Sequence, residues 1–154
     1  MKQTANFTLD ELTKSQTAER KGINNNPSPE QIENLKALAI NILQPVRAHF
    51  DKPLILSSGF RCAQLCIEIG SKITSQHCAD NEAAAADFEI WGVDNEVLAT
   101  WIKSELEYDQ LILEFWKKGE PNSGWVHCSY SRNQNRQQSL RATREDGKVK
   151  YQPW

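Results

Sequence analysis

The segment GWVHCSY, residues 124–130, is one of the two clearest strand patterns in this chain of 154 residues. Side chains alternate across a strand, so we expect His127 on one face with Trp125, and Cys128 on the other face. The second clear strand is QLILEF, at residues 110–115. Together the two segments predict a sheet in the second half of the chain, with a histidine on one of its faces.

Other strands are expected on both sides of this pair. In ADFEIW, residues 86–91, Asp87 alternates with apolar neighbours, which places its carboxylate on the polar face of a strand. LIL, at residues 54–56, is a short apolar run typical of a buried strand. Near the end of the chain, the pair Asp146-Gly147 indicates the tight turn of a β-hairpin.

Helical patterns dominate the first half of the chain. Thr8 and Glu11 have the spacing of a capping box at the start of a short helix. Ser28 has the features of an N-cap, and the apolar spacing after it predicts a long helix that reaches about Phe50. Pro45 should kink this helix or end its regular part, because proline cannot donate a backbone hydrogen bond.

A later helix is expected to begin at Asp94. Its predicted inner face consists of Val97, Leu98, Trp101 and Ile102. Helices precede strands along the chain, which predicts an α+β fold with the helices of the N-terminal half packed on a small antiparallel sheet. The length suits a single domain, residues 1–154, in which residues 132–154 form a basic C-terminal hairpin extension.

The charge distribution narrows the range of partners. The net charge is −2, so nothing global indicates binding to nucleic acid. Residues 132–154 nevertheless carry six Lys and Arg against two Asp and Glu, while residues 1–131 carry 12 against 18. The basic end either pairs with the acidic body at a solvated edge or contacts an anionic polymer such as cell wall.

The opening residues and the cysteines are typical of a protein made in the cytoplasm. Residues 1–12 contain no apolar segment of the kind found in signal peptides, and no stretch approaches the length of a membrane span. We therefore expect synthesis in the cytoplasm, no membrane span, and four cysteines that remain free thiols. A monomer is the expected state.

Three residues on separate predicted elements have side chains that bind metals: His77 in a loop, Asp87 on one strand and His127 on another. Two neutral imidazoles and a carboxylate can fill three corners of a zinc tetrahedron and leave the fourth corner open for water, as in catalytic sites. The remaining histidine, His49, is interpreted as a surface residue near the end of the long helix. Spacing alone does not separate such a site from coincidence.

Four short blocks occur in a fixed order along the chain. They are SSGFR at residues 57–61, SQH at 75–77, AADF at 85–88 and WVH at 125–127. Together with FTLDEL near the N-terminus, these blocks resemble the D-alanyl-D-alanine carboxypeptidase-type zinc peptidases, a family that includes phage L-alanyl-D-glutamate endolysins.

The resemblance implies a role for each residue that matches a family motif. His77, Asp87 and His127 match the zinc ligands. Arg61 matches the arginine that holds a carbonyl or carboxylate of the substrate, and Ser75 matches a serine that lines the substrate site. The implied activity is zinc-dependent hydrolysis of a peptide bond in bacterial peptidoglycan, by a carboxypeptidase or by an endolysin that reaches the wall through lysis or holin-type escape.

The spacing of the first two ligands departs from the family pattern. The family usually has six residues between the histidine and the aspartate, whereas nine separate His77 from Asp87 here. Three extra loop residues cost little closure entropy, so the two ligands can still converge. Asp80 and Glu82 become rival ligands, and Asp87 is preferred because its strand context is kept.

The general base is a second departure. Several relatives have a glutamate three residues before the last histidine, where this chain has Gly124. The best replacement is Glu114, on the neighbouring predicted strand, as the group that accepts the proton of the attacking water. Gln110 shares a face with Glu114 and is expected to bind substrate.

Two other interpretations stay open. The cysteines beside the two key histidines could form a structural Cys/His metal site with the other two cysteines, although Cys128 should point away from His127. Alternatively, the chain is a catalytically inactive cell-wall-binding or virion structural module with the same fold.

Overall fold

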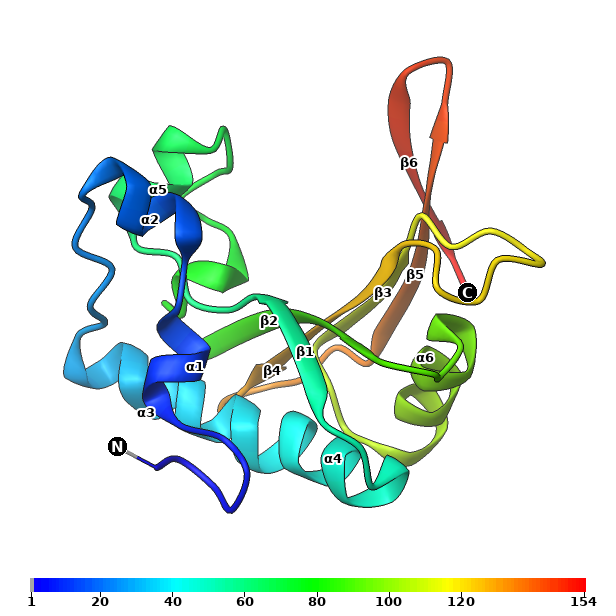
Figure 1. Ribbon diagram of the computed structural model, residues 1–154, viewed down its shortest axis with the longest axis horizontal. Coiled ribbons are helices and arrows are strands. Elements are labelled where there is room, and N and C mark those ends of the chain that lie inside the picture. Colours follow the sequence, from blue (N-terminus) through cyan, green and yellow to red (C-terminus); the bar gives the residue numbers. More distant parts are fainter. Residues whose placement is uncertain (1) are drawn as a thin grey trace.

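A single six-stranded sheet forms the centre of the protein (Figure 1). The computed structural model describes residues 2–154. In order across the sheet the strands are β1 (Leu54–Ser58), β2 (Ala83–Ile90), β4 (Trp125–Ser131), β3 (Gln110–Glu114), β5 (Gln138–Glu145) and β6 (Lys148–Pro153). Helices precede most of these strands along the chain, so the predicted α+β class is confirmed.

One pair of neighbouring strands differs from the expected antiparallel arrangement, because β3 and β5 run parallel. β4 is already paired on both sides, with β2 and with β3, so the chain that leaves it cannot fold back beside it. Residues 132–137 instead reverse the chain and carry it past β3. β5 therefore runs opposite to β4 and in the direction of β3, and β6 pairs antiparallel with β5 at the edge.

The longest helical elements lie on one side of the sheet (Figure 1). The helical elements are α1 (Leu9–Thr13), α2 (Gln16–Lys21), α3 (Pro29–Leu38), the π-helical η1 (Ala39–Leu43), α4 (Gln44–Phe50), α5 (Ala63–Glu68), the 3-10 turn η2 (Gln76–Cys78) and α6 (Asn95–Glu105). α3, η1 and α4 form one continuous helix, which covers the back face of the sheet together with α6 (Figure 1). Within residues 2–154, no helix is long and apolar enough to cross a membrane.

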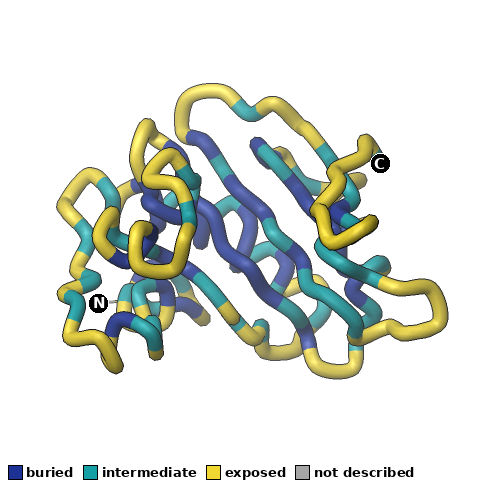
Figure 2. The backbone as a smooth tube through the Cα atoms, turned by 90° about the horizontal axis from the view of Figure 1, so that it is seen from above, coloured by how far each residue is buried: buried dark blue, intermediate teal, exposed yellow. Residues whose placement is uncertain are grey.

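The hydrophobic core lies between this back face and the helices. β2 contributes Ala86, Phe88 and Ile90, each at most 1% exposed, from the face opposite Asp87, as alternation predicted. The long helix contributes Leu35, Leu38, Ile42, Leu43 and Val46. Burying each large apolar side chain is worth about 1.5–3 kcal/mol, so this packing determines which side chains of the sheet remain on the front face. Figure 2 shows the buried central strands bordered by exposed loops.

The long helix shows the effect of Pro45. Ser28 and Gln31 cap its start, each side chain bonding the backbone N–H of the other residue. Proline has no N–H to offer the carbonyl four residues earlier. The preceding turn is π-helical, and the Gln44 N–H donates to the carbonyl of Ala39. The regular α-helix therefore ends ahead of Pro45, as predicted, although the chain stays helical to Phe50.

The prediction that Val97 belongs to the inner face of α6 is wrong, because this residue is 53% exposed. The buried residues of α6 are Asn95, Leu98, Ala99 and Ile102. Each helical residue turns by about 100°, and the face centred on Leu98 and Ile102 excludes Val97. Trp101 is half-buried and stacks on the exposed His49, with 4.3 Å between ring centroids.

Candidate active site

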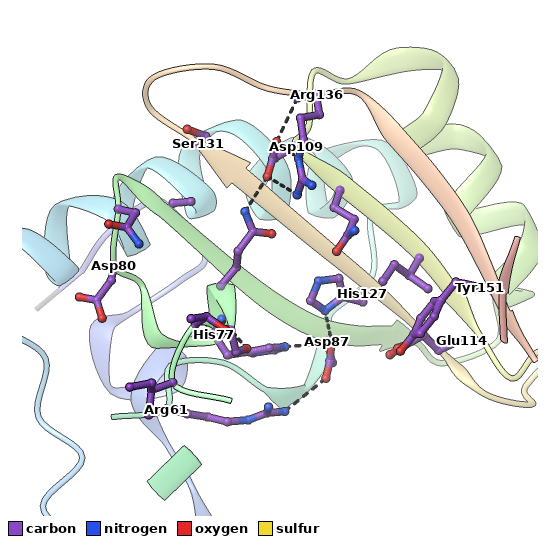
Figure 3. Close-up of a pocket in the computed structure, with 18 of the residues that line it drawn as sticks. Arg61, His77, Asp80, Asp87, Asp109, Glu114, His127, Ser131, Arg136 and Tyr151 are labelled. Atoms are coloured by element: carbon purple, nitrogen blue, oxygen red, sulfur yellow. Dashed lines mark hydrogen bonds and ion pairs between the residues drawn. The ribbon is translucent and has the colours of Figure 1, made fainter. Parts of the chain in front are cut away.

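The three predicted metal ligands meet on the front face of the sheet (Figure 3). Asp87 and His127 are directly opposite each other in the β2–β4 register, so both side chains leave the sheet on the same side. His77 lies on η2, which packs against β2. The ligand atoms of the three residues all lie within 4.8 Å of one another.

The distances suit a tetrahedral zinc ion. Oδ1 of Asp87 lies 2.8 Å from Nδ1 of His127 and 3.3 Å from Nε2 of His77. Bonds of about 2.0–2.1 Å at tetrahedral angles place ligand atoms roughly 3.3 Å apart. Small movements therefore bring the three atoms to a common centre, and the donor set is one that zinc prefers.

The backbone holds His77 with one ring nitrogen free. Its Nδ1 lies 2.9 Å from the carbonyl oxygen of Gly59, and donation there leaves Nε2 to bind a metal. Gly59 cannot be replaced easily, because a Cβ on it would lie 2.3 Å from the carbonyl oxygen of Leu12. The glycine of the SSGFR block thus lets α1 pack closely on the backbone whose carbonyl positions the His77 ring.

The electrostatics favour the protonation states that a metal requires. Burial alone would raise the pKa of Asp87, but hydrogen bonds from His127 and His77 outweigh burial and hold this pKa well below its usual range. Burial lowers the pKa of His77, although Asp87 opposes the effect. An ionised carboxylate and a neutral imidazole are the forms that bind zinc.

Two serines direct Arg61 at the cluster of His77, Asp87 and His127. Its Nε donates to Oγ of Ser58 at 2.9 Å, and one terminal nitrogen lies 3.4 Å from Oγ of Ser71. The other terminal nitrogen is 3.6 Å from Oδ2 of Asp87. The guanidinium group therefore lies beside the ligands, where its planar fork can bind a carbonyl or carboxylate of a substrate.

A cavity of about 880 Å³ opens above this cluster. Its lining includes Arg61, which follows β1, Ser75 at the start of η2, and Glu114 and Gln110 from β3. The volume lies in the usual range for sites that enclose a small ligand or part of a peptide, about 300–1,000 Å³.

The model of a family described as peptidase M15 matches residues 5–129. This chain belongs to the peptidase M15 family. The matched segment contains all three cluster residues and ends inside β4. No curated protein matches the chain. The family resemblance of the sequence blocks is thus confirmed, and the family and the cluster together support a metallopeptidase.

The long loop between the first two ligands of this M15 peptidase is compact. Ala79, Asn81 and Glu82 have positive φ angles of 55°, 56° and 63°, which turn the chain sharply. Nδ2 of Asn34 donates to the carbonyl of Ala79 at 2.7 Å, and the N–H of Arg132 donates to the carbonyl of Glu82 at 2.8 Å. These bonds hold the extra residues against the body of the protein.

The two rival acids of this loop do not join the cluster. Asp80 is exposed and accepts a hydrogen bond from Nε2 of Gln31 at 3.1 Å. In the described chain, residues 2–154, neither Asp80 nor Glu82 belongs to a group able to hold a metal. Asp87 is the acid that the fold brings to the histidines.

The cysteines do not join the cluster either. All four are free thiols, as expected. Cys128 is buried on the back face of β4, and Sγ of Cys66 contacts Sγ of Cys78 at 3.0 Å. Since no cysteine within residues 2–154 shares a metal-binding group with the histidines, the alternative of a structural Cys/His site is wrong.

Glu114 lies on the front face, diagonal to His127 across β3 and β4, because its direct partner is Trp125. Diagonal positions on one face are about 7–8 Å apart, within reach of long side chains. Burial raises the pKa of Glu114. A raised pKa suits a carboxylate that must accept a proton during catalysis.

The backbone at Gly124, where the sequence resemblance implied a glutamate, leaves no room for a side chain. Its φ angle is +65°, and a Cβ on it would lie 1.8 Å from the carbonyl oxygen of Glu114. A side chain fits there only if the β3 backbone moves. The space beside the last ligand is therefore occupied by the strand that presents Glu114.

Ser75 and Gln110 line the cavity, but both already make hydrogen bonds. Oγ of Ser75 accepts the N–H of His77 at 3.2 Å and so caps η2. Nε2 of Gln110 donates to Oε1 of Gln138 at 2.8 Å. Ser75 thus supports the turn that presents the first ligand, and substrate binding by either residue stays a prediction.

The sequence did not predict that residues from the C-terminal segment line the cavity. They are Gln134, Arg136 and Tyr151. Arg136 donates to both oxygens of the buried Asp109 at 2.9 Å, and Nε2 of Gln76 donates to the same carboxylate. The network links the 132–137 loop to the neighbour of His77. The only signal in the sequence was the excess of basic residues after residue 131.

Proposed function

We propose that this M15 peptidase hydrolyses a peptide bond in bacterial peptidoglycan with zinc as its cofactor, as a phage-type endolysin. One observation carries the proposal: His77, Asp87 and His127 converge under an open cavity, with Arg61 on one side and Glu114 on the other. This is the minimum set for hydrolysis of an amide by a metallopeptidase.

Glu114 and Arg61 have different roles in the proposed hydrolysis. Zinc, when bound here, supplies a Lewis acid that polarises the carbonyl of the scissile bond and acidifies water. Glu114 accepts the proton of the attacking water and returns it to the leaving amine. Arg61 donates hydrogen bonds to the substrate oxygen on which negative charge develops, an effect worth about 10²–10³ in rate for a well-placed donor.

Peptidoglycan is the substrate that best fits these features. Its stem peptides carry free carboxylates, which match the permanent charge of Arg61. The basic segment 132–154, with six Lys and Arg against two Asp and Glu, lies beside the cavity and suits an anionic polymer. The protein acts on the wall after lysis or holin-type escape.

Mass spectrometry of muropeptides tests the proposal. Purified peptidoglycan is incubated with zinc-loaded protein, with chelator-treated protein and with His127→Ala. New peptide products should form only with the zinc-loaded protein, and zinc should restore cleavage after chelation. His49→Ala is the matched control, because His49 is exposed and stacks on Trp101, away from the ligands. Equal cleavage by His127→Ala would refute the site.

The digests, with a sedimentation assay beside them, decide between an enzyme and an inactive module. A zinc-loaded protein that yields no products, yet sediments with insoluble peptidoglycan, would be a binding or structural protein with this fold.

A further inference from the structure

The hairpin of β5 and β6 lies outside the segment that matches the family, residues 5–129, yet it forms part of the active-site cavity. β5 extends the central sheet by pairing with β3, and β6 is the last strand. In Figure 1 the hairpin rises from the sheet on the side away from α5. The cavity therefore has a wall that the family match does not include.

The strand register aligns one side chain of this wall with the predicted general base. Glu114 pairs with Ala142, and Ala142 pairs with Tyr151, so the three residues form one row on the front face. Two strand spacings of about 4.8 Å separate the ends of the row. Ala142 is small and 0% exposed, so the ring of Tyr151 can cross it toward Glu114. Figure 3 shows Tyr151 beside Glu114, and both line the cavity.

The wall is held in place by contacts at its base and near its turn. The N–H of Trp154 donates to the carbonyl of Ser139 at 3.1 Å. Nζ of Lys103 lies 4.8 Å from the centroid of the Trp154 ring. On the front face, the guanidinium of Arg144 lies 5.0 Å from the ring centroid of Phe115. Cation–π contacts of this kind and a continuous ladder fix the position of the hairpin.

Tyr151 offers a neutral donor on the opposite side of the metal cluster from Arg61. Tyr151 is 54% exposed, and the partial burial of its ring together with the nearby Glu114 raises its pKa, so its phenol remains protonated at neutral pH. The hydroxyl of Tyr151 makes no hydrogen bond with any other group of residues 2–154. The hydroxyl is therefore available to a ligand in the cavity.

We propose that Tyr151 is a substrate-positioning residue: its ring forms the cavity wall opposite Arg61, and its hydroxyl donates a hydrogen bond to a backbone carbonyl of the bound peptide. This inference rests on the proposed function, because it takes a stem peptide as the occupant. It assigns the C-terminal hairpin to substrate recognition.

Two variants separate the roles of the ring and the hydroxyl. Tyr151→Phe keeps the ring, and Tyr151→Ala removes both. Loss of one neutral hydrogen bond should weaken binding about two- to tenfold, so Tyr151→Phe should raise KM and Kd by that factor with little change in kcat. Tyr151→Ala should raise both further. Val149→Ala, a truncation of the same strand at a residue that does not line the cavity, is the matched control.

The measurements are kcat and KM on a purified disaccharide-tetrapeptide muropeptide, the Kd of zinc-loaded protein for it by calorimetry, and zinc content. A purely structural role predicts a lower Tm and lower zinc content in place of a selective rise in KM and Kd. Wild-type Kd and KM in both variants, with zinc content intact, would overturn the inference and leave the proposed function standing. Weaker binding by Tyr151→Phe without cleavage by any form would refute the proposed function and support the inference. A wild-type protein that neither binds nor cuts the muropeptide would overturn both.

Discussion

Gly124 allows a direct test of the position assigned to Glu114. Replacing Gly124 with alanine adds one carbon atom, which would lie 1.8 Å from the carbonyl oxygen of Glu114. Ordinary contacts begin near 3.4 Å, so the β3 backbone must move by more than 1 Å. The movement should reach the Glu114 side chain, because it displaces the residue itself.

The loss of unfolding free energy in Gly124→Ala has two contributions. A left-handed backbone conformation costs a non-glycine residue about 1–2 kcal/mol. Overpacking against a fixed strand costs about 1–3 kcal/mol more. Gly119→Ala is the matched control, because Gly119 has a φ angle of +85° and a Cβ added to it would meet nothing within 4 Å. The control should therefore lose only the conformational contribution.

Chemical denaturation and peptide hydrolysis are the assays. We expect Gly124→Ala to lose about 1–3 kcal/mol more free energy of unfolding than Gly119→Ala. Its kcat should fall by about 10²-fold, the typical effect of a 1 Å misplacement of a catalytic group. If the two variants unfold with equal free energies and cut peptide equally well, the close approach of the two strands at Gly124 is wrong.

Three other predictions follow from the site and the core. Glu114→Gln should lower kcat by about 10²–10⁴-fold with unchanged zinc content. Wild-type activity of this variant would exclude Glu114 as the base. Glu107→Gln, on the loop before β3, is the matched control. Asp109 has a folded-state pKa held below its usual range, since hydrogen bonds from Arg136 outweigh burial. Its stabilising effect is therefore present above the unfolded pKa of about 3.9 and is lost as pH falls through the lower folded pKa. Asp109→Asn should flatten the fall in unfolding free energy between about pH 4 and pH 2, and an unchanged slope would contradict the Asp109 pairing. Burial raises the pKa of the Cys78 thiol to about 12, so a thiol reagent at pH 8 should react quickly with about one thiol of the native protein and with all four after denaturation. Fast reaction of several native thiols would refute their burial.

Much of the fold could be predicted from local patterns. The alternation around Asp87 and His127 identified both strands and the face on which each side chain lies, because the back face has to be apolar to pack on helices. The capping residues at Ser28 and the effect of Pro45 act within a few residues, so they were also visible in the sequence. Asp146-Gly147 indicated its hairpin for the same reason.

The remaining features depend on which strands are neighbours, and a single sequence does not contain that information. The parallel pairing of β5 follows from β4 being occupied on both sides. That pairing in turn brings Tyr151 into the row of Glu114 and Arg136 to Asp109. The inner face of α6 was misjudged at Val97, because an apolar residue beside the buried stripe gives no local sign of its exposure. The convergence of His77 with the two strand ligands was suggested by family resemblance, and spacing alone could not have established it.

β6 also has a consequence for handling the protein. All of its residues are exposed, and it leaves one row of backbone groups free at the margin of the sheet. Such margins invite strands of other molecules and start fibrils. Lys148 and Lys150 place charge along this margin, and Pro153 removes a donor at its end, so the strand is a poor template for growth. The protein should therefore not form fibrils in concentrated solution, and fibrous precipitate should not compete with crystallisation.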